Sequence, residues 1–402
     1  MSHIDALWGF LVAGVISFVM APLAARLARS IGAIDMPRER GLSDGPTPRL
    51  GGLAILAGVA AAGLLFLPLF GDTPVDEQTR GIVLGALTIA LVGTADDIWD
   101  LPAPVKLLGQ VGAALIPVLA GVRVETFTLP FVGHVDLSGA AGPVTVIGMV
   151  AVMNVVNFTD GVDGLAAGVC TIAAGTLAIV ALSLDKACLD GTPTCTGAGV
   201  LAAITAGAAF GFLYHNFHPA SIFMGDAGSN LLGLLLACVA IQGTIKTAAI
   251  VALFFPLTVL AVPIIDGAFV VMKRIKYRRP VYEADRWHLH HRLANIGFSQ
   301  RRTVLYLYGW TLALAALALA LRFVPYSDDH GHFNAGWTIV LVGFGLLALG
   351  ASLYLVYVLE ILKFTRFRRR EIMRETGEDV SDSEIERQVR GEVETGEWEA
   401  VK

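Results

Sequence analysis

The chain has 402 residues, of which 55% are hydrophobic and 16% are charged, and its mean hydropathy is +0.67. An ordinary soluble domain carries about 25% charged residues, so a water-soluble globule of this composition could not cover its surface with polar groups. The 29 basic and 34 acidic residues give a formal net charge of −5, which disfavours nucleic-acid binding. The composition also excludes a disulfide scaffold, a coiled coil and a disordered chain, and it leaves a polytopic membrane protein.

Apolar segments recur along the chain at the length that a bilayer requires. A membrane-spanning helix needs about 20 mostly apolar residues, and the backbone polar groups of a span must be bonded internally, which favours helices. We therefore predict an all-α polytopic fold with about eleven transmembrane helices. These cover residues 4–28, 51–70, 81–98, 104–121, 143–158, 165–184, 198–216, 230–242, 247–272, 303–323 and 337–362. No basic residue precedes Arg26, so the first segment is predicted to be a retained helix and not a signal peptide.

The basic residues gather on one side of this predicted topology. With eleven helices, 24 of the 29 basic residues lie on the face that holds the odd-numbered loops and the C-terminal tail, at helix ends or in the loops. Because Lys and Arg favour the cytoplasmic side, we predict an external N-terminus and a cytoplasmic C-terminus in a multi-pass plasma-membrane protein. Residues 1–362 form the predicted transmembrane domain, and residues 363–402 form a charged cytoplasmic tail.

Two of the predicted external loops carry distinguishing features. Residues 122–137 alternate apolar and polar side chains, which predicts a small β-hairpin over the membrane. Cys188 and Cys195 lie in another external loop, on the side of the membrane where disulfides persist. A disulfide bridge and two free thiols both agree with the sequence.

The first cytoplasmic motifs lie next to the second and third helices. Residues 46–52, Pro-Thr-Pro-Arg-Leu-Gly-Gly, predict a rigid turn whose paired glycines let a ligand approach the backbone closely. The third helix ends with Asp96 and Asp97, followed by Asp100. Adjacent carboxylates repel each other, and a helix C-terminus disfavours anions. We therefore expect Asp96 and Asp97 to serve as a proton acceptor or as a divalent-metal site, and not merely as a polar helix end.

Two further cytoplasmic loops place acidic residues among glycines. Asn157, Asp160 and Asp163 precede the sixth helix, whose N-terminal dipole tolerates anions and offers N–H groups to phosphate. A calcium loop is disfavoured here because the remaining ligands of an EF-hand are missing. Asp226 lies at the entry of the eighth helix, and Asn216 precedes it by ten residues. Taken alone, Asp226 also fits a helix-capping residue.

The predicted ninth loop contains a cluster of histidines. His288, His290 and His291 lie between Arg286 and Arg292. Three histidines can bind zinc, but the neighbouring positive charges oppose a second cation and favour an anion. We predict a clamp for a phosphate or pyrophosphate group, with a zinc site and a purely structural cluster as the alternatives.

All of these motifs lie on the predicted cytoplasmic face. Mg²⁺ typically takes one or two carboxylates and completes its octahedron with phosphate oxygens and water. Clustered carboxylates, glycine-rich turns and a basic histidine loop therefore indicate magnesium together with a phosphorylated substrate. The membrane setting indicates that one substrate is water-soluble and that the other is a lipid.

With these motifs the chain resembles the polyprenyl-phosphate N-acetylhexosamine-1-phosphate transferases of glycosyltransferase family 4, and within them the WecA/TagO type that uses UDP-GlcNAc. The resemblance covers nearly all of residues 1–362. It rests on five motifs in order, at residues 46–52, 96–100, 157–164, 223–226 and 288–292. Family members transfer GlcNAc-1-phosphate from UDP-GlcNAc to a polyprenyl (undecaprenyl or decaprenyl) phosphate and release UMP. The resemblance implies that this chain performs that first lipid-linked step of cell-envelope glycan synthesis in a bacterium.

The resemblance also implies roles for individual residues. Asp96 and Asp97 would lie near the lipid phosphate, one of them as its general base. Asp226 would be the leading ligand of Mg²⁺, for which Mn²⁺ is an alternative. The implied metal ligands are Asp226, Asp97 and Asp160. The implied substrate-binding residues are Asn157, Asp160, Asp163, Asn216, Arg49, His288, His290, His291 and Arg292.

One departure from the family pattern and three alternatives remain. Family members usually carry a basic residue and a histidine just before the turn at 46–52, and this pair is missing here, which leaves Arg38, Arg40 and Arg49 to contact an anionic ligand. The same chemistry with another UDP-sugar, such as UDP-MurNAc-pentapeptide, is the first alternative. A transporter or flippase for lipid-linked sugars is the alternative from a different class. A homodimer is an open alternative to a monomer.

Overall fold

The computed structural model describes residues 2–36, 46–129, 133–184, 194–244, 300–325, 334–348 and 350. The chain divides into two compact units, Met1–Ile265 with Val304–Tyr326, and Asp266–Thr303 with Ser327–Lys402. The described part of the second unit consists of residues 300–303, an apolar helix, Ala335–Ala348, and its immediate neighbours. The other described helices and all described strands belong to the first unit.

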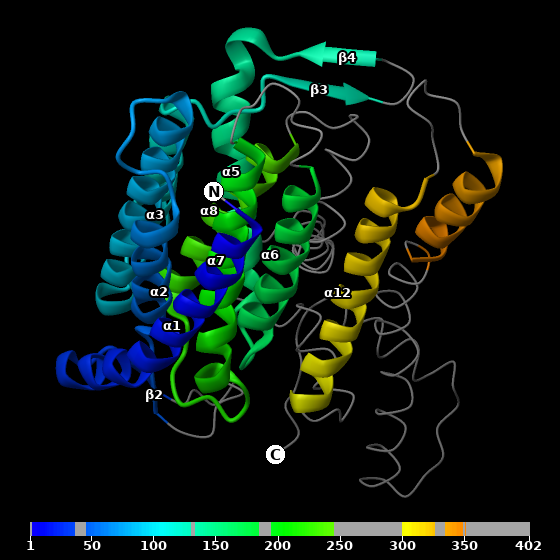
Figure 1. Ribbon diagram of the computed structural model, residues 1–402. Helices are drawn as coiled ribbons and strands as arrows, with labels where there is room; N and C mark the ends of the chain where they lie inside the picture. The colour runs from blue at the N-terminus through cyan, green and yellow to red at the C-terminus, as the bar shows by residue number, and fades with distance from the viewer. Residues whose placement is uncertain are drawn as a thin grey trace, which may run out of the picture. The chain divides into compact units, whose positions relative to one another are not determined.

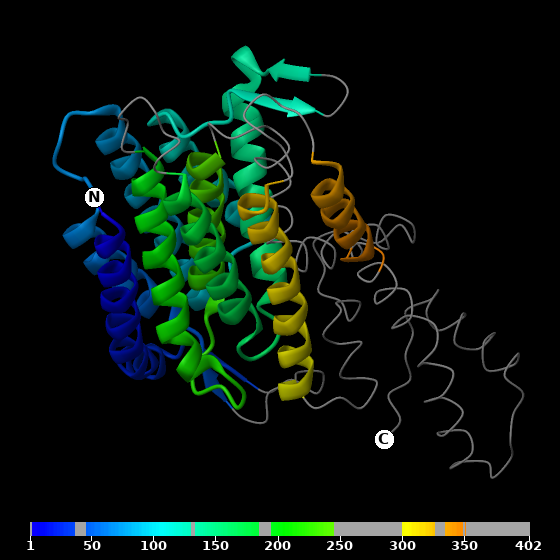
Figure 2. The same ribbon diagram turned by 45° about the vertical axis from the view of Figure 1, so that its right-hand side comes forward.

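The first unit is a bundle of apolar helices (Figure 1). Its described helices are α1 (His3–Ile31), α2 (Gly51–Phe66), α3 (Pro74–Trp99), α4 (Ala103–Leu119), α5 (Ala141–Thr159), α6 (Leu165–Ser183), α7 (Thr194–Asn216), α8 (Gly225–Thr244) and most of α12 (Gln300–Phe323). The helix α8 packs against every helix from α2 to α7, and Figure 2 shows it inside the bundle. Residues 231–240 of α8 are all buried. This agrees with the rule that a helix with apolar residues on all sides lies in a core.

The prediction of a polytopic helical membrane protein is confirmed. Every described α-helix overlaps a predicted segment. Within the described ranges, seven helices are long and apolar enough to cross a membrane: His3–Ile31, Pro74–Trp99, Ser138–Thr159, Leu165–Ser183, Thr196–Asn216, Gly225–Gln242 and Gln300–Phe323. The helices α2, α4 and Ala335–Ala348 are apolar but shorter. The count of eleven and the sidedness stay predictions, and the segments 247–272 and 363–402 lie outside the described residues.

The helices α3 and α8 begin five or more residues earlier than predicted because their first turns are polar. The helix α3 begins at Pro74 and not at residue 81, and Thr73 caps it by accepting a hydrogen bond from the N–H of Asp76. The helix α8 begins at Gly225 and not at residue 230. The first turn of α8 therefore contains Asp226.

Two short strand pairs complete the first unit. The strands β3 (Thr126–Leu129) and β4 (Gly133–Asp136) pair antiparallel, which confirms the hairpin predicted in residues 122–137. A second pair, β1 (Ile34–Asp35) with β2 (Thr47–Pro48), was not predicted. It ties the start of the turn at 46–52 to the chain just after α1.

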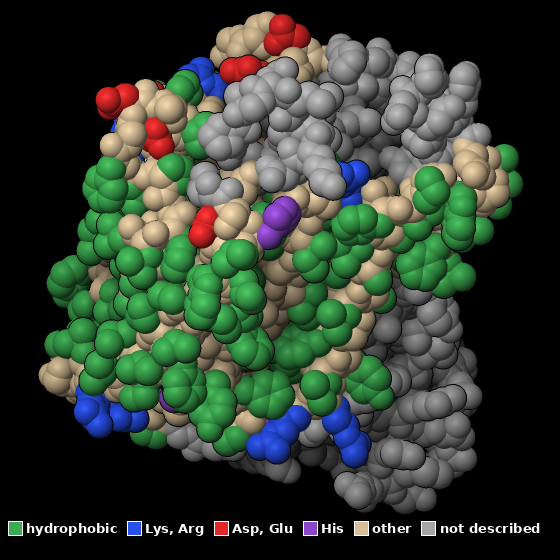
Figure 3. All heavy atoms as spheres, viewed as in Figure 1, with side chains coloured by type: hydrophobic (Ala, Val, Ile, Leu, Met, Phe, Trp, Pro, Cys, Tyr) green, Lys and Arg blue, Asp and Glu red, His purple; other side chains and the backbone are tan. Residues whose placement is uncertain are grey.

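A broad apolar band covers the visible face of the first unit. Figure 3 shows hydrophobic side chains over the middle of this face, Asp and Glu side chains above them, and Lys and Arg side chains along the lower edge. Exposed hydrophobic side chains also follow one face of α1, where Leu7, Leu11 and Val15 lie one helical turn apart. Extended apolar surface of this kind marks contact with a membrane or a partner, and the apolar helices identify it here as the lipid-facing surface.

Candidate active site

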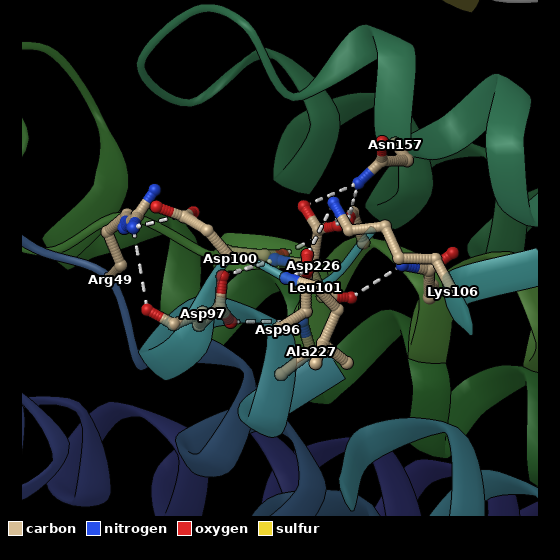
Figure 4. A network of polar contacts seen from close by, with 12 residues as sticks. Arg49, Asp96, Asp97, Asp100, Leu101, Lys106, Asn157, Asp226 and Ala227 are labelled. Carbon is tan, nitrogen blue, oxygen red and sulfur yellow. Dashed lines mark hydrogen bonds and ion pairs between the residues drawn. The ribbon is translucent and has the colours of Figure 1, made fainter. Parts of the chain in front are cut away.

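Two carboxylates from distant parts of the chain meet at one lysine (Figure 4). Lys106 Nζ lies 2.5 Å from Asp96 Oδ2 and 2.9 Å from Asp226 Oδ2. Asp96 belongs to the last turn of α3, Lys106 to the first turn of α4 and Asp226 to the first turn of α8. Asp96 is buried, whereas the Lys106 side chain is 37% exposed. The cluster therefore lies where three helix ends meet, and its cation is partly open to solvent.

Asp97 binds the first backbone N–H groups of α8. Its Oδ1 accepts a hydrogen bond from Asp226 N at 2.9 Å, and its Oδ2 accepts one from Ala227 N at 3.2 Å. The first N–H groups of a helix have no partner within the helix, and the helix dipole favours a negative charge at this end. Asp97 therefore caps α8 from α3 and holds Asp226 beside Asp96.

Two glycines allow α2 and α3 to approach the start of α8. A Cβ atom at Gly93 would lie 2.5 Å from Ala227 N, and a Cβ atom at Gly52 would lie 2.6 Å from the carbonyl carbon of Ala227. Both separations are shorter than real Cβ contacts, so any side chain at these positions would displace α8. The glycine pair at 51–52 was expected to admit a ligand, but the close neighbour of Gly52 in the structure is the backbone of α8.

Asn157 holds the other side of Asp226. Its Nδ2 donates to Asp226 Oδ1 at 3.0 Å and to Ser229 Oγ at 2.9 Å. Asn157 belongs to the last turn of α5, so a fourth helix end joins the cluster. Because Lys106 lies on Oδ2 and Asn157 on Oδ1, both carboxylate oxygens of Asp226 have a fixed partner.

The turn at 46–52 brings a second positive charge to the cluster. Backbone hydrogen bonds of 2.8–2.9 Å tie this turn to residues 223–224, directly before α8. Arg49 Nη2 lies 3.4 Å from Asp100 Oδ1 and 3.5 Å from the carbonyl oxygen of Asp97. Among the described residues, the buried Nε of Arg49 has no hydrogen-bond partner. The guanidinium thus lies at the end of α3, close to the carboxylates.

Asp163 and Asn216 fasten the turn before α6 to the loop before α8. Asp163 accepts a hydrogen bond from Ala220 N at 3.1 Å and lies 2.9 Å from His218 Nδ1. Asn216 accepts one from Gly164 N at 3.1 Å. Both side chains are buried, with 8% of Asp163 and 1% of Asn216 exposed. These contacts make the two residues part of the frame around the cluster.

Asp160 lies in the turn between α5 and α6, outside the membrane-spanning segments. Burial raises the pKa of its carboxyl well above the usual range, and the negative charges of Asp226, Asp97 and Asp163 raise it further. An ionised Asp160 is therefore unfavourable in the protein alone. A cation in the cluster would lower this penalty.

The donor set of the cluster suits a hard cation such as Mg²⁺. No three Asp, Glu, His or Cys side chains in the described ranges are arranged to surround one metal ion. Mg²⁺ usually needs only one or two carboxylates, because phosphate oxygens and water complete its shell. Asp96 and Asp226 already converge on one cation, the ammonium of Lys106. Among the described residues, the carboxylates near this point outnumber the basic side chains of Lys106 and Arg49, which favours a further positive charge.

The structure brings most of the described predicted site residues together. The cluster contains Asp96, Asp97, Asn157, Asp226 and, at its edge, Arg49. Asp160 is near enough for the charges of the cluster to shift its pKa, whereas Asp163 and Asn216 belong to the frame. The predicted residues Arg38, Arg40, His288, His290, His291 and Arg292, with Cys188, lie outside the described residues.

Lys106 and Ser229 belong to the cluster but were not predicted as site residues. Lys106 was counted only among the 24 basic residues of the predicted cytoplasmic face, although it is the single basic residue between Asp100 and the apolar part of α4. Its place so soon after three aspartates was a usable signal. Ser229 had no such signal, because a serine in a first helical turn is common.

The chain is similar to known proteins over most of its length. The profile of glycosyl transferase family 4 matches residues 79–244. The chain is 36% identical over 313 residues to a probable undecaprenyl-phosphate N-acetylglucosaminyl 1-phosphate transferase of Bacillus subtilis, across 77% of this chain and 84% of that protein. It is 36% identical over 336 residues to the decaprenyl-phosphate N-acetylglucosaminephosphotransferase of Mycobacterium leprae, across 78% and 83%. It is 34% identical over 345 residues to a phospho-N-acetylmuramoyl-pentapeptide-transferase of Desulforudis audaxviator, across 77% and 95%.

Proposed function

Because the chain belongs to glycosyl transferase family 4, among its polyprenyl-phosphate N-acetylglucosamine-1-phosphate transferases, we propose that the cluster around Asp226 is its active site. The chain transfers GlcNAc-1-phosphate to a polyprenyl phosphate, and the proposed donor is UDP-GlcNAc, with UMP as the second product. The observation that carries the assignment is that Lys106 and Asn157 both bind Asp226, while Asp96 binds the same ammonium group of Lys106.

The reaction is a displacement at phosphorus. An oxygen of the lipid phosphate attacks the β-phosphorus of UDP-GlcNAc, the bond from this phosphorus to the bridging oxygen breaks, and UMP leaves with the electron pair. Such transfers depend mainly on positioning and on charge neutralisation. Lys106 and Arg49 supply positive charge for the phosphate oxygens, and both side chains are partly exposed.

The two adjacent aspartates have different roles in this proposal. Asp97 accepts hydrogen bonds from the first N–H groups of α8 and thereby holds Asp226 in place. Asp96 holds the ammonium of Lys106 against Asp226. A lipid phosphate is already an anion near neutral pH, so neither aspartate needs to remove a proton from it.

Mg²⁺ is the proposed cofactor, with Mn²⁺ as the alternative. Asp226 and Asp96 would hold the ion, and Asp97 and Asp160 lie next to them. When bound, Mg²⁺ would neutralise the diphosphate and stabilise the charge on the departing UMP. The support for this assignment is the excess of carboxylates in the cluster and the raised pKa of Asp160.

The metal assignment is tested with Asp226→Ala. We expect this variant to stay folded, to release no UMP and to lose the rise in Tm that Mg²⁺ causes in the substrate-free protein, since a bound ion stabilises the folded state. Asp136→Ala in the hairpin is the matched control and should behave as the unaltered protein. An unchanged Mg²⁺-dependent rise in Tm in Asp226→Ala would contradict the role of Asp226.

The donor is tested by UMP release from purified full-length protein with polyprenyl phosphate. Parallel reactions contain UDP-GlcNAc or UDP-MurNAc-pentapeptide, each with and without EDTA. We expect UMP only from UDP-GlcNAc and only without EDTA. UMP from the muropeptide donor alone would contradict the proposed donor, and transport of a lipid-linked sugar without UMP release would support the flippase alternative.

The proposed location is the plasma membrane, with the active site on the cytoplasmic face. The distribution of the basic residues supports this orientation. An active site on this face would also be open to a soluble nucleotide sugar in the cytoplasm.

A further inference from the structure

Three helices that meet at the active site each carry a second polar residue one turn deeper in the bundle. On α4, Gln110 follows Lys106 by four residues, and on α8, Asn230 follows Asp226 by four. On α5, which runs in the opposite direction, Asn154 precedes Asn157 by three residues. Residues three or four apart share one face of a helix. The three amides therefore form a layer directly below the three active-site side chains.

Hydrogen bonds join these amides into one chain. Asn154 Nδ2 donates to Gln110 Oε1 at 2.9 Å, and Gln110 Nε2 donates to Asn230 Oδ1 at 2.8 Å. Asn230 Nδ2 donates to the carbonyl oxygen of Asp226 at 2.8 Å. The orientation of every amide follows from the last bond, because a carbonyl oxygen only accepts and each amide then presents its own oxygen to the next donor.

The layer lies in the interior of an apolar bundle. Gln110 is 6% exposed and Asn230 is 5% exposed, and Asn154 is half-buried. A buried amide that loses its hydrogen-bond partner destabilises the fold, so each amide bond requires a defined axial position and rotation of the neighbouring helix. Apolar side chains would fill this space without such a requirement. The amides thus make the packing of α4 and α5 against α8 directional.

We propose that Gln110, Asn154 and Asn230 are positioning residues that set the distances among Lys106, Asn157 and Asp226. The amide layer fixes the register of α4 and α5 on α8. Lys106 and Asn157 then meet the two carboxylate oxygens of Asp226 at hydrogen-bond distance. This inference rests on the function proposed above, because the geometry that the layer maintains is that of the proposed active site.

The chain contains a matched control for this layer. Gln242 Nε2 donates to Gln78 Oε1 at 3.2 Å and joins α8 to α3. Gln242 is 5% exposed, as buried as Asn230. It lies sixteen residues after Asp226 on the same helix, which corresponds to about 24 Å along the axis. Loss of this bond disturbs helix packing far from the active site.

The test compares Gln110→Met with Gln242→Met in the full-length protein. Both changes keep most of the side-chain volume and remove the hydrogen bonds. We expect Gln110→Met to lower the kcat of UMP release by about 10-fold to 100-fold, the scale of a misplacement near 1 Å, with less than about a twofold change in the donor KM. Gln242→Met should lower Tm by a similar amount and keep kcat within about twofold.

A second pair of variants separates positioning from packing. Gln110→Asn and Asn230→Gln each disturb the bond between α4 and α8, whereas the double exchange restores the summed length of the two side chains. We expect the double variant to recover most of the kcat that each single variant loses. Asn154→Leu, at the half-buried end of the layer, gives the same measurement if a change at Gln110 prevents folding.

The outcomes distinguish this inference from the proposed function. Unaltered protein that releases no UMP would overturn the function and the positioning role with it. Active protein in which Gln110→Met and Gln242→Met lower kcat equally, in step with Tm, would overturn the positioning role alone. A double exchange no better than the worse single variant would also count against it.

Discussion

Asp96 and Asp97 are adjacent in the sequence, but their carboxylates have different partners. Consecutive residues of an α-helix point about 100° apart. Asp96 consequently faces the partly exposed Lys106, and Asp97 faces the backbone at the start of α8. Asp96 binds a charged side chain and also accepts a hydrogen bond from Leu101 N just after α3, whereas Asp97 binds the first N–H groups of a different helix.

This difference predicts that Asp96→Asn and Asp97→Asn separate activity from stability. We expect each change to lower kcat by about 100-fold or more, the scale of losing one charge-stabilising group. Only Asp97→Asn should also lower Tm, because an amide accepts from one of the two N–H groups where a carboxylate accepts from both, and loss of a helix cap costs about 1 kcal/mol. Thermal unfolding in detergent measures the difference, and an equal loss of Tm in both variants would contradict it.

The buried carboxyl group of Asp160 leads us to expect that replacing it with an uncharged residue stabilises the protein in a pH-dependent way. Its pKa in the folded protein is raised, so the folded state binds this proton more tightly than the unfolded chain. Its contribution to stability is therefore lost as the pH rises above the ordinary aspartate value of about 3.9. We expect metal-free Asp160→Asn to have a higher Tm than the unaltered protein at pH 7, with a difference that shrinks toward pH 4, and to be less active.

The measurement for Asp160 is thermal unfolding across this pH range in the presence of EDTA. Asp136→Asn in the hairpin controls for removing one acidic side chain at an exposed position. A Tm difference of the same size at every pH would show that the effect of Asp160→Asn does not come from ionisation.

The sequence identifies acidic site residues more readily than their partners. Asp96, Asp97 and Asp226 stand out because carboxylates are costly at the ends of apolar helices and need a reason to be there. Lys106 does not stand out, since a lysine at such a helix end also serves membrane orientation. Asn216 was predicted to bind substrate, but its buried amide bonds to Gly164 N. A sequence does not reveal whether a polar side chain faces a cavity or the protein backbone.

At the scale of elements, the bent helix α1 (Figure 1) receives a backbone contact from a side chain of another helix. Pro22 lies inside α1 and has no N–H group, so the carbonyl oxygen of Phe18 lacks its usual partner four residues later. His215 Nε2 of α7 lies 3.0 Å from this oxygen and donates to it. The histidine thus completes the backbone bonding of α1 and joins two helices that pack along each other.

This arrangement predicts a coupling between His215 and Pro22. We expect His215→Ala to lower stability by about 1 kcal/mol, because it leaves the Phe18 carbonyl oxygen without a donor. In a Pro22→Ala background the new N–H of residue 22 can take over this bond, so His215→Ala should cost less there. A double-mutant cycle on Tm measures the coupling, and strictly additive effects would contradict it.

Element positions follow from hydropathy, and element ends do not. The apolar stretches locate every described α-helix, but the starts of α3 and α8 are polar turns that hydropathy assigns to loops. In α8 this misassignment concerns the turn that carries Asp226. The pair β1–β2 has two residues in each strand, too few for an alternating pattern. Hydrogen bonding to the rest of the protein, which hydropathy ignores, decides these ends.

At the scale of the whole molecule, the sequence predicts the spans but not their neighbours. Contacts such as α1 with α7 and α3 with α8 join segments far apart in the chain. Helices that are apolar on most sides show no preferred face from which a packing order could be inferred. Once the structure is known, small residues explain part of the packing order, because α2 and α3 contact α8 at Gly52 and Gly93.

The chain path places the hairpin and the active site at opposite ends of the first unit. The helix α4 begins at the active site with Lys106 in its first turn and ends at Leu119, shortly before the hairpin. Its 17 residues span about 25 Å. The helix α5 returns over a similar length from the hairpin to Asn157. The proposed cytoplasmic active site therefore requires an external hairpin.

This requirement predicts opposite labelling of two introduced cysteines. We expect Glu125→Cys, next to the hairpin, to react with a membrane-impermeant maleimide in intact cells, whereas Ala103→Cys, at the start of α4, should react only after permeabilisation. Both positions are exposed. Replacing Cys188 and Cys195 by serine limits the background, because Cys170 and Cys238 are buried. Labelling of Ala103→Cys in intact cells would reverse the orientation and place the active site on the side away from the cytoplasmic nucleotide sugar.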